Sequence, residues 1–287
     1  MKNRTFSIFV AFVLSIPLSG VAQVSGLSAQ LTKKWETEAI LKIPESVLYD
    51  TVSGIVYVSN INGNPSGKDG NGFVSRLSPA GKIIDLEWVK GLDAPKGMTI
   101  FNNHLFVTNI DEVVEIDIAA AKIIRRYPVK GSSFLNDLAV NEQGLFFFTD
   151  TQLGCVFVLD KGIVNPWLKE EMFAGANGLC YNNGFLYIGT GNSIIKADVA
   201  TGEVVVAVAN TGSVDGLFLA KNGKFIYSDW KGSVFIAPPN GRPTLLLNTS
   251  PQKVNAADFG TIPSKNMILI PTFGNNKLVG YSSPLIN

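Results

Sequence analysis

The sequence predicts an all-β fold, a six-bladed β-propeller, because one hairpin motif recurs six times along the chain. The clearest copy is Val214–Asp229, VDGLFLAKNGKFIYSD, in which two apolar strands flank Asn222-Gly223. That dipeptide favours a type I′ hairpin turn. Successive copies start 51, 40, 41, 38 and 42 residues apart, a spacing typical of propeller blades. Their first residues are Glu45, Lys96, Asn136, Asn177, Asp215 and Ala257.

A second pair of apolar segments follows each hairpin, which gives four antiparallel strands per unit. In the first unit these segments are Phe73–Leu77 and Ile83–Trp88. The sixth unit ends after Leu278–Ser282 with only three strands. We therefore predict that an N-terminal strand, Trp35–Leu41, supplies the fourth strand and closes the ring, since closure hides sheet edges. A β-sandwich would not explain the repeat.

The amino terminus has the pattern of a secretory signal peptide. A short basic segment precedes the apolar run Phe6–Leu18, and the small residues Gly20–Ala22 suit a cleavage site. The run is shorter than the roughly 20 residues that span a bilayer. We expect residues 1–22 to be removed, residues 23–287 to form one propeller domain, and the protein to be secreted or periplasmic with no membrane span.

Charge and cysteine content narrow the classes of partner. The chain has 24 basic and 23 acidic residues, and this balance argues against nucleic-acid or polybasic membrane-surface binding. A small-molecule substrate or ligand is the expected partner, and the assembly state cannot be predicted. Cys155 and Cys180 either pair in an exported protein or remain two buried thiols.

In a propeller, the six inner strands begin at one end of the central channel, so the first residues of the six repeats form a ring there. Four of them, Glu45, Asn136, Asn177 and Asp215, offer carboxylate and amide oxygens suited to Ca²⁺, with Zn²⁺, Mn²⁺ or Mg²⁺ as alternatives. Lys96 lies in the same ring, and its ammonium could neutralise the carboxylates instead. Alternatively, the Asn-Gly and Asp-Gly pairs only form tight turns, but this does not account for Glu45.

The order of these motifs, one per successive blade, resembles the gluconolactonase, regucalcin (senescence marker protein) and luciferin-regenerating-enzyme family of six-bladed propellers. The motifs are Glu45, Asn136-Asp137, Asn177-Gly178-Leu179 and Asp215-Gly216-Leu217, and they extend over essentially the whole mature chain. The resemblance implies that Glu45, Asn177 and Asp215 hold a divalent cation, that Asp215 is the general base, and that Asn136 contacts substrate or metal. Phe134 stands where the sugar-lactonase members carry arginine, which argues against a sugar-acid lactone.

Further ligand contacts are expected on the same face. The predicted substrate-binding residues are Asn136, Asp137, Lys96, Asp150, Asp229 and Trp230. Trp230 and Phe273 form either an apolar wall or ordinary packing between blades. The insertion Ile61–Gly72 is either a mobile flap, with Lys68 and Asp69 in reach of a ligand, or a solvated loop.

The sequence therefore predicts an exported, divalent-metal-dependent hydrolase of a lactone or related ester. The alternative is a non-catalytic propeller that binds a small molecule, glycan or protein, with Lys96 and Glu45 paired in place of the metal. A histidine general base, as in paraoxonase-type propellers, is excluded because His104, the only histidine, lies in a predicted turn on the opposite face. Strictosidine-synthase-like chemistry has little support, since Ala256, Ala257 and Asp258 lack the glutamate of that family.

Overall fold

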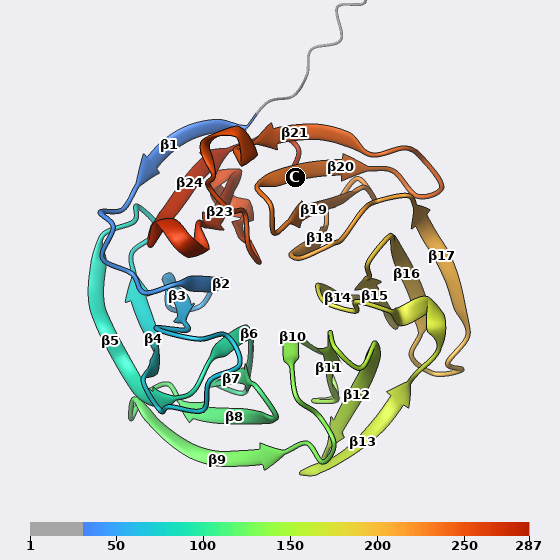
Figure 1. The fold of residues 1–287 in the computed structure, drawn as a ribbon, viewed down its shortest axis with the longest axis horizontal. Helices are drawn as coiled ribbons and strands as arrows, with labels where there is room; N and C mark the ends of the chain where they lie inside the picture. Colours follow the sequence, from blue (N-terminus) through green and yellow to red (C-terminus); the bar gives the residue numbers. More distant parts are fainter. Residues whose placement is uncertain (1–30, 287) are drawn as a thin grey trace, which may run out of the picture.

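The computed structural model describes residues 31–286, so the predicted signal peptide, residues 1–22, lies outside the described residues. Six four-stranded antiparallel sheets surround a central axis (Figure 1). The predicted six-bladed β-propeller is therefore confirmed. Within residues 31–286, no helix is both long and apolar enough to cross a membrane.

Each blade has four strands, arranged side by side from the axis to the rim (Figure 1). Blade one comprises β2 (Pro44–Asp50), β3 (Ile55–Asn60), β4 (Gly72–Leu77) and β5 (Ile83–Leu92). Blade two comprises β6 (Pro95–Phe101), β7 (His104–Asn109), β8 (Glu112–Asp117) and β9 (Lys122–Pro128). Blade three comprises β10 (Leu135–Val140), β11 (Phe146–Asp150), β12 (Cys155–Asp160) and β13 (Ile163–Leu168). Blades four to six comprise β14 (Leu179–Asn182), β15 (Phe185–Gly189), β16 (Ser193–Asp198), β17 (Val204–Ala209); β18 (Leu217–Leu219), β19 (Phe225–Asp229), β20 (Ser233–Ala237), β21 (Thr244–Asn248); β22 (Gly260–Ile262), β23 (Met267–Pro271), β24 (Leu278–Ser282) and β1 (Thr32–Glu36).

The ring is closed by the N-terminal strand, as predicted, but with different bounds. β1 is Thr32–Glu36, which pairs antiparallel with β24, whereas the sequence indicated Trp35–Leu41. The prediction followed the apolar pair Ile40-Leu41, which does not lie in the sheet. Leu41 is instead fully buried in the core beside blade one, and Ile40 is exposed. The apolar character of Leu41 therefore reflects burial in the core and not membership of a strand.

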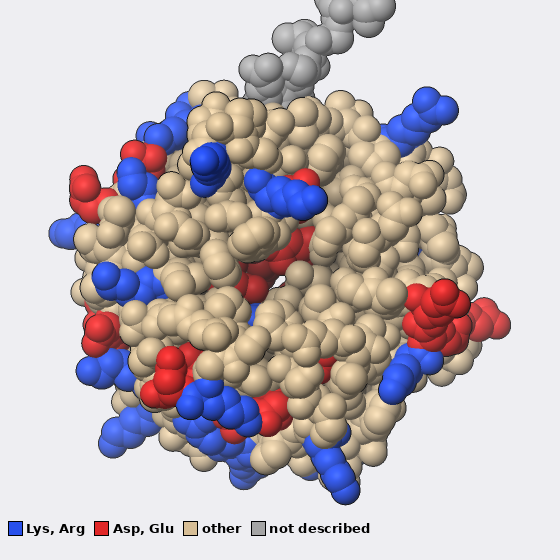
Figure 2. All heavy atoms as spheres, in the orientation of Figure 1, with Lys and Arg blue, Asp and Glu red and all other residues tan. Residues whose placement is uncertain are grey.

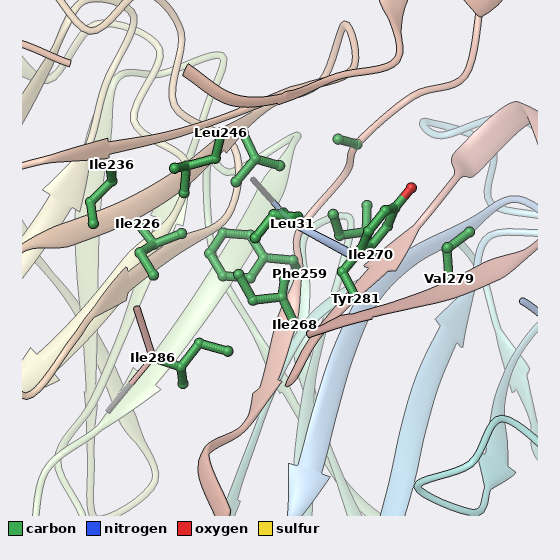
Figure 3. Packing of buried hydrophobic residues seen from close by; sticks show 12 residues of the cluster. Leu31, Ile226, Ile236, Leu246, Phe259, Ile268, Ile270, Val279, Tyr281 and Ile286 are labelled. Carbon is green, nitrogen blue, oxygen red and sulfur yellow. The ribbon is translucent and has the colours of Figure 1, made fainter. Parts of the chain in front are cut away.

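The apolar core lies between neighbouring blades rather than in one central mass. Between blades five and six, Ile226 and Ile236 face Phe259 and Ile268, with Ile286 packed beside them (Figure 3). Burial of each such side chain contributes roughly 1.5–3 kcal/mol.

Glycines set the spacing of the inner strands near the axis. A Cβ on Gly178 would lie 2.1 Å from the carbonyl oxygen of Asp215, and one on Gly97 would lie 2.5 Å from Asp137 Oδ1. Gly97, Gly178 and Gly216 all have φ outside the left-handed region. The Lys-Gly, Asn-Gly and Asp-Gly pairs are therefore explained by close approach between successive blades and not by tight turns.

Hydroxyl side chains on the second strands fix the first residue of the next inner strand. Each hydroxyl sits one residue before the end of its strand or beside it, and donates to a backbone carbonyl of the following blade. The contacts run from Thr108 to Asn136, from Thr149 to Asn177 (2.9 Å) and from Ser228 to Ala257 (3.0 Å). Hydroxyl groups of the preceding blade thus hold the backbone at Asn136, Asn177 and Ala257.

The turn at Asn222-Gly223 differs from the type I′ prediction. Gly223 has φ +77°, but Asn222 does not have a positive φ. The Gly223 N–H donates to Ala220 O at 2.9 Å, and the Ala220 N–H donates to Lys224 O at 2.9 Å. This is a type I turn followed by a glycine bulge. Asn183-Gly184, with φ of +48° and +83°, adopts the two-residue geometry expected of a type I′ turn.

Candidate functional site

A cavity of about 300 Å³ lies at the end of the channel where the inner strands begin. Its polar residues come from four blades and are Glu45, Lys96, Asn177 and Asp215. Its apolar wall consists of Ile61, Pro65, Phe134, Trp230 and Phe273. Figure 2 shows acidic atoms in the hollow at the axis of the ring. The structure thus brings together four of the predicted ring residues.

Two oxygens in this cavity have no hydrogen-bond partner. They are Glu45 Oε2 and Asn177 Oδ1, both buried, and the only other such side-chain atom in residues 31–286 is Arg76 Nε. Asn177 Nδ2 donates to Asp215 Oδ1 at 2.8 Å, which fixes the amide. An unsatisfied buried oxygen costs roughly 1–3 kcal/mol, so a bound cation would remove a penalty at both atoms.

The donor set fits a hard divalent cation that accepts neutral oxygens as well as carboxylates. Residues 31–286 contain no cluster of three or more His, Cys, Asp or Glu side chains with metal-binding geometry. A site here therefore needs the amide oxygen of Asn177 beside the carboxylates of Glu45 and Asp215. Ca²⁺ accepts such mixed carboxylate and amide ligands.

Burial raises the pKa of Asp215 to about 7, opposed by the Asn177 hydrogen bond and reinforced by the charges of Asp137 and Asp229. Burial likewise raises the pKa of Glu45 well above its usual range, and the Asp215 charge raises it further. A carboxyl whose pKa lies near neutrality can take and release a proton under physiological conditions. The Asp215 carboxyl can therefore exchange a proton near neutral pH.

Lys96 points into the same cavity and is 1% exposed. Its ammonium donates to Pro65 O at 3.1 Å and to Ala94 O at 3.2 Å, and lies 4.4 Å from the centre of the Phe134 ring. Burial lowers the Lys96 pKa to about 8, although the charge of Glu45 opposes this. Among the ion pairs of residues 31–286, none joins Lys96 to a carboxylate within 4.0 Å. The Lys96 charge thus neighbours the acidic residues without pairing with them.

Asn136 and Asp137 lie apart from this cavity. Asn136 is buried, and its Nδ2 donates to Thr151 Oγ1 at 3.1 Å within its own blade. Asp137 lines a second cavity of about 360 Å³ further along the channel, where its carboxylate accepts the N–H groups of Leu138 and Leu179 at 2.7 and 2.5 Å. Burial raises the pKa of Asp137 to about 7, against those two hydrogen bonds.

The rim carboxylates position the wall residues. Asp150 Oδ2 accepts the Phe134 N–H at 3.2 Å and bonds to the two preceding serines, and these contacts set the loop that presents Phe134. Asp229 Oδ1 accepts the Ser233 N–H at 2.9 Å, which fixes the turn that carries Trp230. Neither carboxylate belongs to the cavity lining.

Trp230 and Phe273 both line the cavity, and their rings meet edge to face with centroids 5.5 Å apart. Trp230 is 50% exposed, so it is not merely a packing residue between blades. Ile61 and Pro65, from the insertion, complete the wall, and sequence reasoning had not assigned either to the site. The sequence feature that pointed to these two residues is the position of the insertion, which joins two strands on the same face as the ring of predicted site residues.

The insertion is tied to neighbouring loops rather than free of them. Lys68 forms an ion pair with Asp111 at 2.5 Å, and the Gly70 N–H donates to Asp93 Oδ1 at 3.0 Å. Asp69 bonds to Asn71 within the insertion. Lys68 and Asp69 are therefore used in holding the loop, and Pro65 is its residue at the cavity.

The remaining reactive side chains lie elsewhere. Cys155 and Cys180 are both free thiols. His104 Nδ1 is 2.6 Å from Glu115 Oε1 at the hairpin between β6 and β7, and does not line the cavity. This agrees with the exclusion of a histidine general base.

Comparison with known proteins shows the fold. No protein-family model and no curated protein matches the sequence. A gluconolactonase from Xanthomonas campestris is 16% identical with a TM-score of 0.69, over 91% of this chain and 93% of that one. A second candidate gluconolactonase is 14% identical with a TM-score of 0.64, over 90% and 93%. A catalytically inactive histidine-to-alanine variant of virginiamycin B lyase from Staphylococcus aureus, bound to quinupristin, is 14% identical with a TM-score of 0.59, over 86% and 98%.

The chain has the fold of the gluconolactonase propellers. At these identities the likeness concerns the fold alone. It agrees with the resemblance that the order of the ring motifs indicated.

Proposed function

We propose that this protein is a divalent-cation-dependent hydrolase of a lactone or related ester. The observation that carries the proposal is the pair of unpartnered oxygens, Glu45 Oε2 and Asn177 Oδ1, in one cavity with the Asp215 carboxyl. The shared fold with gluconolactonases supports the same class of reaction.

The residues of the cavity divide the work of hydrolysis. A divalent cation held by Glu45, Asn177 and Asp215 would polarise the ester carbonyl as a Lewis acid. Asp215, held by the Asn177 amide at 2.8 Å, takes a proton from the attacking water. The water oxygen bonds to the acyl carbon, the bond from that carbon to the alcohol oxygen breaks, and the proton passes from Asp215 to that oxygen. The product is a hydroxy acid.

A screen of lactones tests the activity. The full chain is assayed with Ca²⁺, Zn²⁺ or Mn²⁺ against aromatic, alkyl and sugar lactones, beside Asp215→Ala. We expect turnover that needs the cation and disappears in Asp215→Ala. Absence of any turnover that depends on Asp215 would overturn the proposal.

Lyase chemistry is less compatible with this cavity. Virginiamycin B lyase loses activity when a histidine becomes alanine. The only histidine of the present chain, His104, bonds to Glu115 outside the cavity. The carboxyl of Asp215 favours hydrolysis instead.

Export is the second part of the proposal, and it is supported by the basic start and apolar run of residues 1–22. Expression of the full chain in a secreting host, followed by mass measurement of the mature protein, tests it. We expect a mature N-terminus at Gln23. An uncleaved chain in the cytoplasm would contradict it.

A non-catalytic binding protein is the other candidate, and the buried charge of Lys96 favours it because the lysine could neutralise Glu45 without a metal. Thermal melting with and without chelator separates the two. Ca²⁺ at 100 times its dissociation constant stabilises by about 2.7 kcal/mol, which raises Tm by roughly 5–10 °C for a chain of this size. No shift on chelation would favour the metal-free binder.

A further inference from the structure

The buried charge of Lys96 has only neutral partners. Its ammonium is held by two backbone carbonyls, Pro65 O and Ala94 O, and by the face of Phe134. The charges of Glu45 and Asp150 act on Lys96, but neither carboxylate lies within 4.0 Å of its ammonium. A buried ammonium without a close ion pair is costly, and an anion in contact with it adds a Coulombic attraction that neutral carbonyls do not supply. A negatively charged group that enters the cavity beside Lys96 would therefore be stabilised there.

The charge balance of the cavity indicates how much negative charge fits. Cation binding requires the ionised forms of Glu45 and Asp215, whose pKa values burial raises in the free protein, and the divalent cation of the proposed function balances their two negative charges. The ammonium of Lys96 then gives the lining of the cavity a net charge of +1. A ligand with a single negative charge makes the cavity neutral.

The rest of the wall selects the body of the ligand. Ile61, Phe134, Trp230 and Phe273 present carbon surfaces to the cavity, and the half-exposed Trp230 has ring surface free for contact. Hydroxyl groups of a sugar acid would find few partners there, and buried polar groups without partners weaken binding. The volume of about 300 Å³ suits one ring or a short chain.

We propose that the cavity binds an apolar monocarboxylate, with the carboxylate at Lys96 and the aromatic or alkyl body against Phe134 and Trp230. This inference rests on the proposed function, for which such a ligand is the hydroxy acid released from an apolar lactone. It assigns Lys96 as the residue that binds the acidic end and Trp230 as a specificity residue. Sugar acids are excluded by the same wall.

Calorimetry with a non-reacting ligand tests the proposal without turnover. The full chain with Ca²⁺ is titrated with 3-phenylpropionate, its neutral amide 3-phenylpropanamide, and gluconate. We expect 3-phenylpropionate to bind at least tenfold more tightly than either. Equal affinity for the neutral amide would overturn the role of the Lys96 charge, and tighter binding of gluconate would overturn the role of the wall. These comparisons use the wild-type protein and do not depend on the folding of any variant.

Matched lysine variants locate the charge. Lys96→Met is compared with Lys224→Met, which removes an exposed lysine at the hairpin before β19, outside the cavity. We expect Lys96→Met to weaken 3-phenylpropionate binding at least tenfold and Lys224→Met to change it less than threefold. An unchanged affinity in folded Lys96→Met would contradict the assignment. Trp230→Ala should weaken binding of 3-phenylpropionate but not of acetate, which has no aromatic body.

The outcomes separate the two proposals. Binding of 3-phenylpropionate that depends on Lys96, without turnover of any lactone, removes the hydrolase and leaves the ligand assignment. Turnover of lactones with no preference for an apolar carboxylate product removes the ligand assignment and leaves the hydrolase.

Discussion

The two ends of the central channel carry similar acidic residues, but the hydrogen-bond partners of these residues differ between the ends. At one end, Glu45 and Asp215 line a cavity in which Glu45 Oε2 lacks a partner. At the other, Asp137 accepts two backbone N–H groups, and Asp258 Oδ2 bonds to Ser46 Oγ at 2.5 Å. Burial raises the pKa of the carboxyl groups at both ends.

The comparison separates acids that hold the ring together from acids that await a ligand. Asp137 ties β10 to β14, and Asp258 ties the last blade to the first through Ser46 and a backbone bond from its N–H to Glu45 O at 3.0 Å. A raised pKa therefore does not identify a functional carboxyl here. The unpartnered Glu45 Oε2 is what distinguishes the two ends, because native proteins rarely leave a buried oxygen without a partner.

The largest expected effect comes from the same isosteric change at each end. Asp215→Asn should lower lactone turnover by about 10²–10⁴-fold, because it removes the general base. Asp258→Asn should retain turnover within about threefold, because Asp258 lies outside the catalytic cavity. Initial rates with Ca²⁺ measure both. Equal losses in the two variants would erase the distinction between the ends.

The second effect concerns the cation. Glu45→Gln should weaken Ca²⁺ binding by about two orders of magnitude, since affinity follows the charge of the ligand set. Ser46→Ala, the adjacent change that affects only the Asp258 end, should leave Ca²⁺ affinity unchanged. Calorimetric titration reads both. If Glu45→Gln bound Ca²⁺ with the affinity of the wild type, Glu45 would not be a ligand and the metal site would have to lie elsewhere.

The third effect lies in the hydroxyl that connects the two ends. Thr149 Oγ1 accepts the Asp137 N–H at 3.1 Å and donates to Asn177 O at 2.9 Å. Thr149→Val should lower the free energy of unfolding by roughly 1–3 kcal/mol, because both buried groups lose a partner. Urea unfolding measures it, with exposed Thr51→Val as the control expected within about 0.5 kcal/mol of wild type. Equal stability of the two variants would mean that the hydroxyl does not hold the ring.

The smallest effect is the pH dependence of Ca²⁺ binding. Asp215, with its pKa raised to about 7, must release a proton before it binds the cation. Because the pKa of Glu45 is raised as well, apparent affinity should fall by at least about tenfold for each pH unit below pH 7. Calorimetry in buffers of different ionisation enthalpy also counts the released protons. Constant affinity between pH 5.5 and 7 would show that Asp215 is not a ligand.

The sequence predicted the architecture because the residues that form apolar strands and turns recur along the chain with the period of the blades. The missing strand of the sixth unit also predicted closure. The bounds of that strand were wrong because Leu41 looks the same in a sequence whether it lies in a strand or plugs a core.

The site was predicted in part. Glu45, Asn177 and Asp215 meet in one cavity, since their places at the strand starts follow from the repeat. The direction of the Asn136 amide, toward Thr151, depends on a rotamer that spacing does not determine. Pro65 reaches the cavity only through the path of the insertion, which has no periodic pattern.

The pairing of β1 with β24 joins residues about 250 positions apart, such as Trp35 and Gly280. Each of the first five blades can assemble from one continuous stretch, because all its strands are consecutive. The sixth blade cannot, because its outermost strand, β1, comes from the opposite end of the polypeptide. Ring closure therefore depends on a contact between segments far apart in the sequence, and contacts of this kind slow folding because the chain entropy of bringing the segments together must first be overcome.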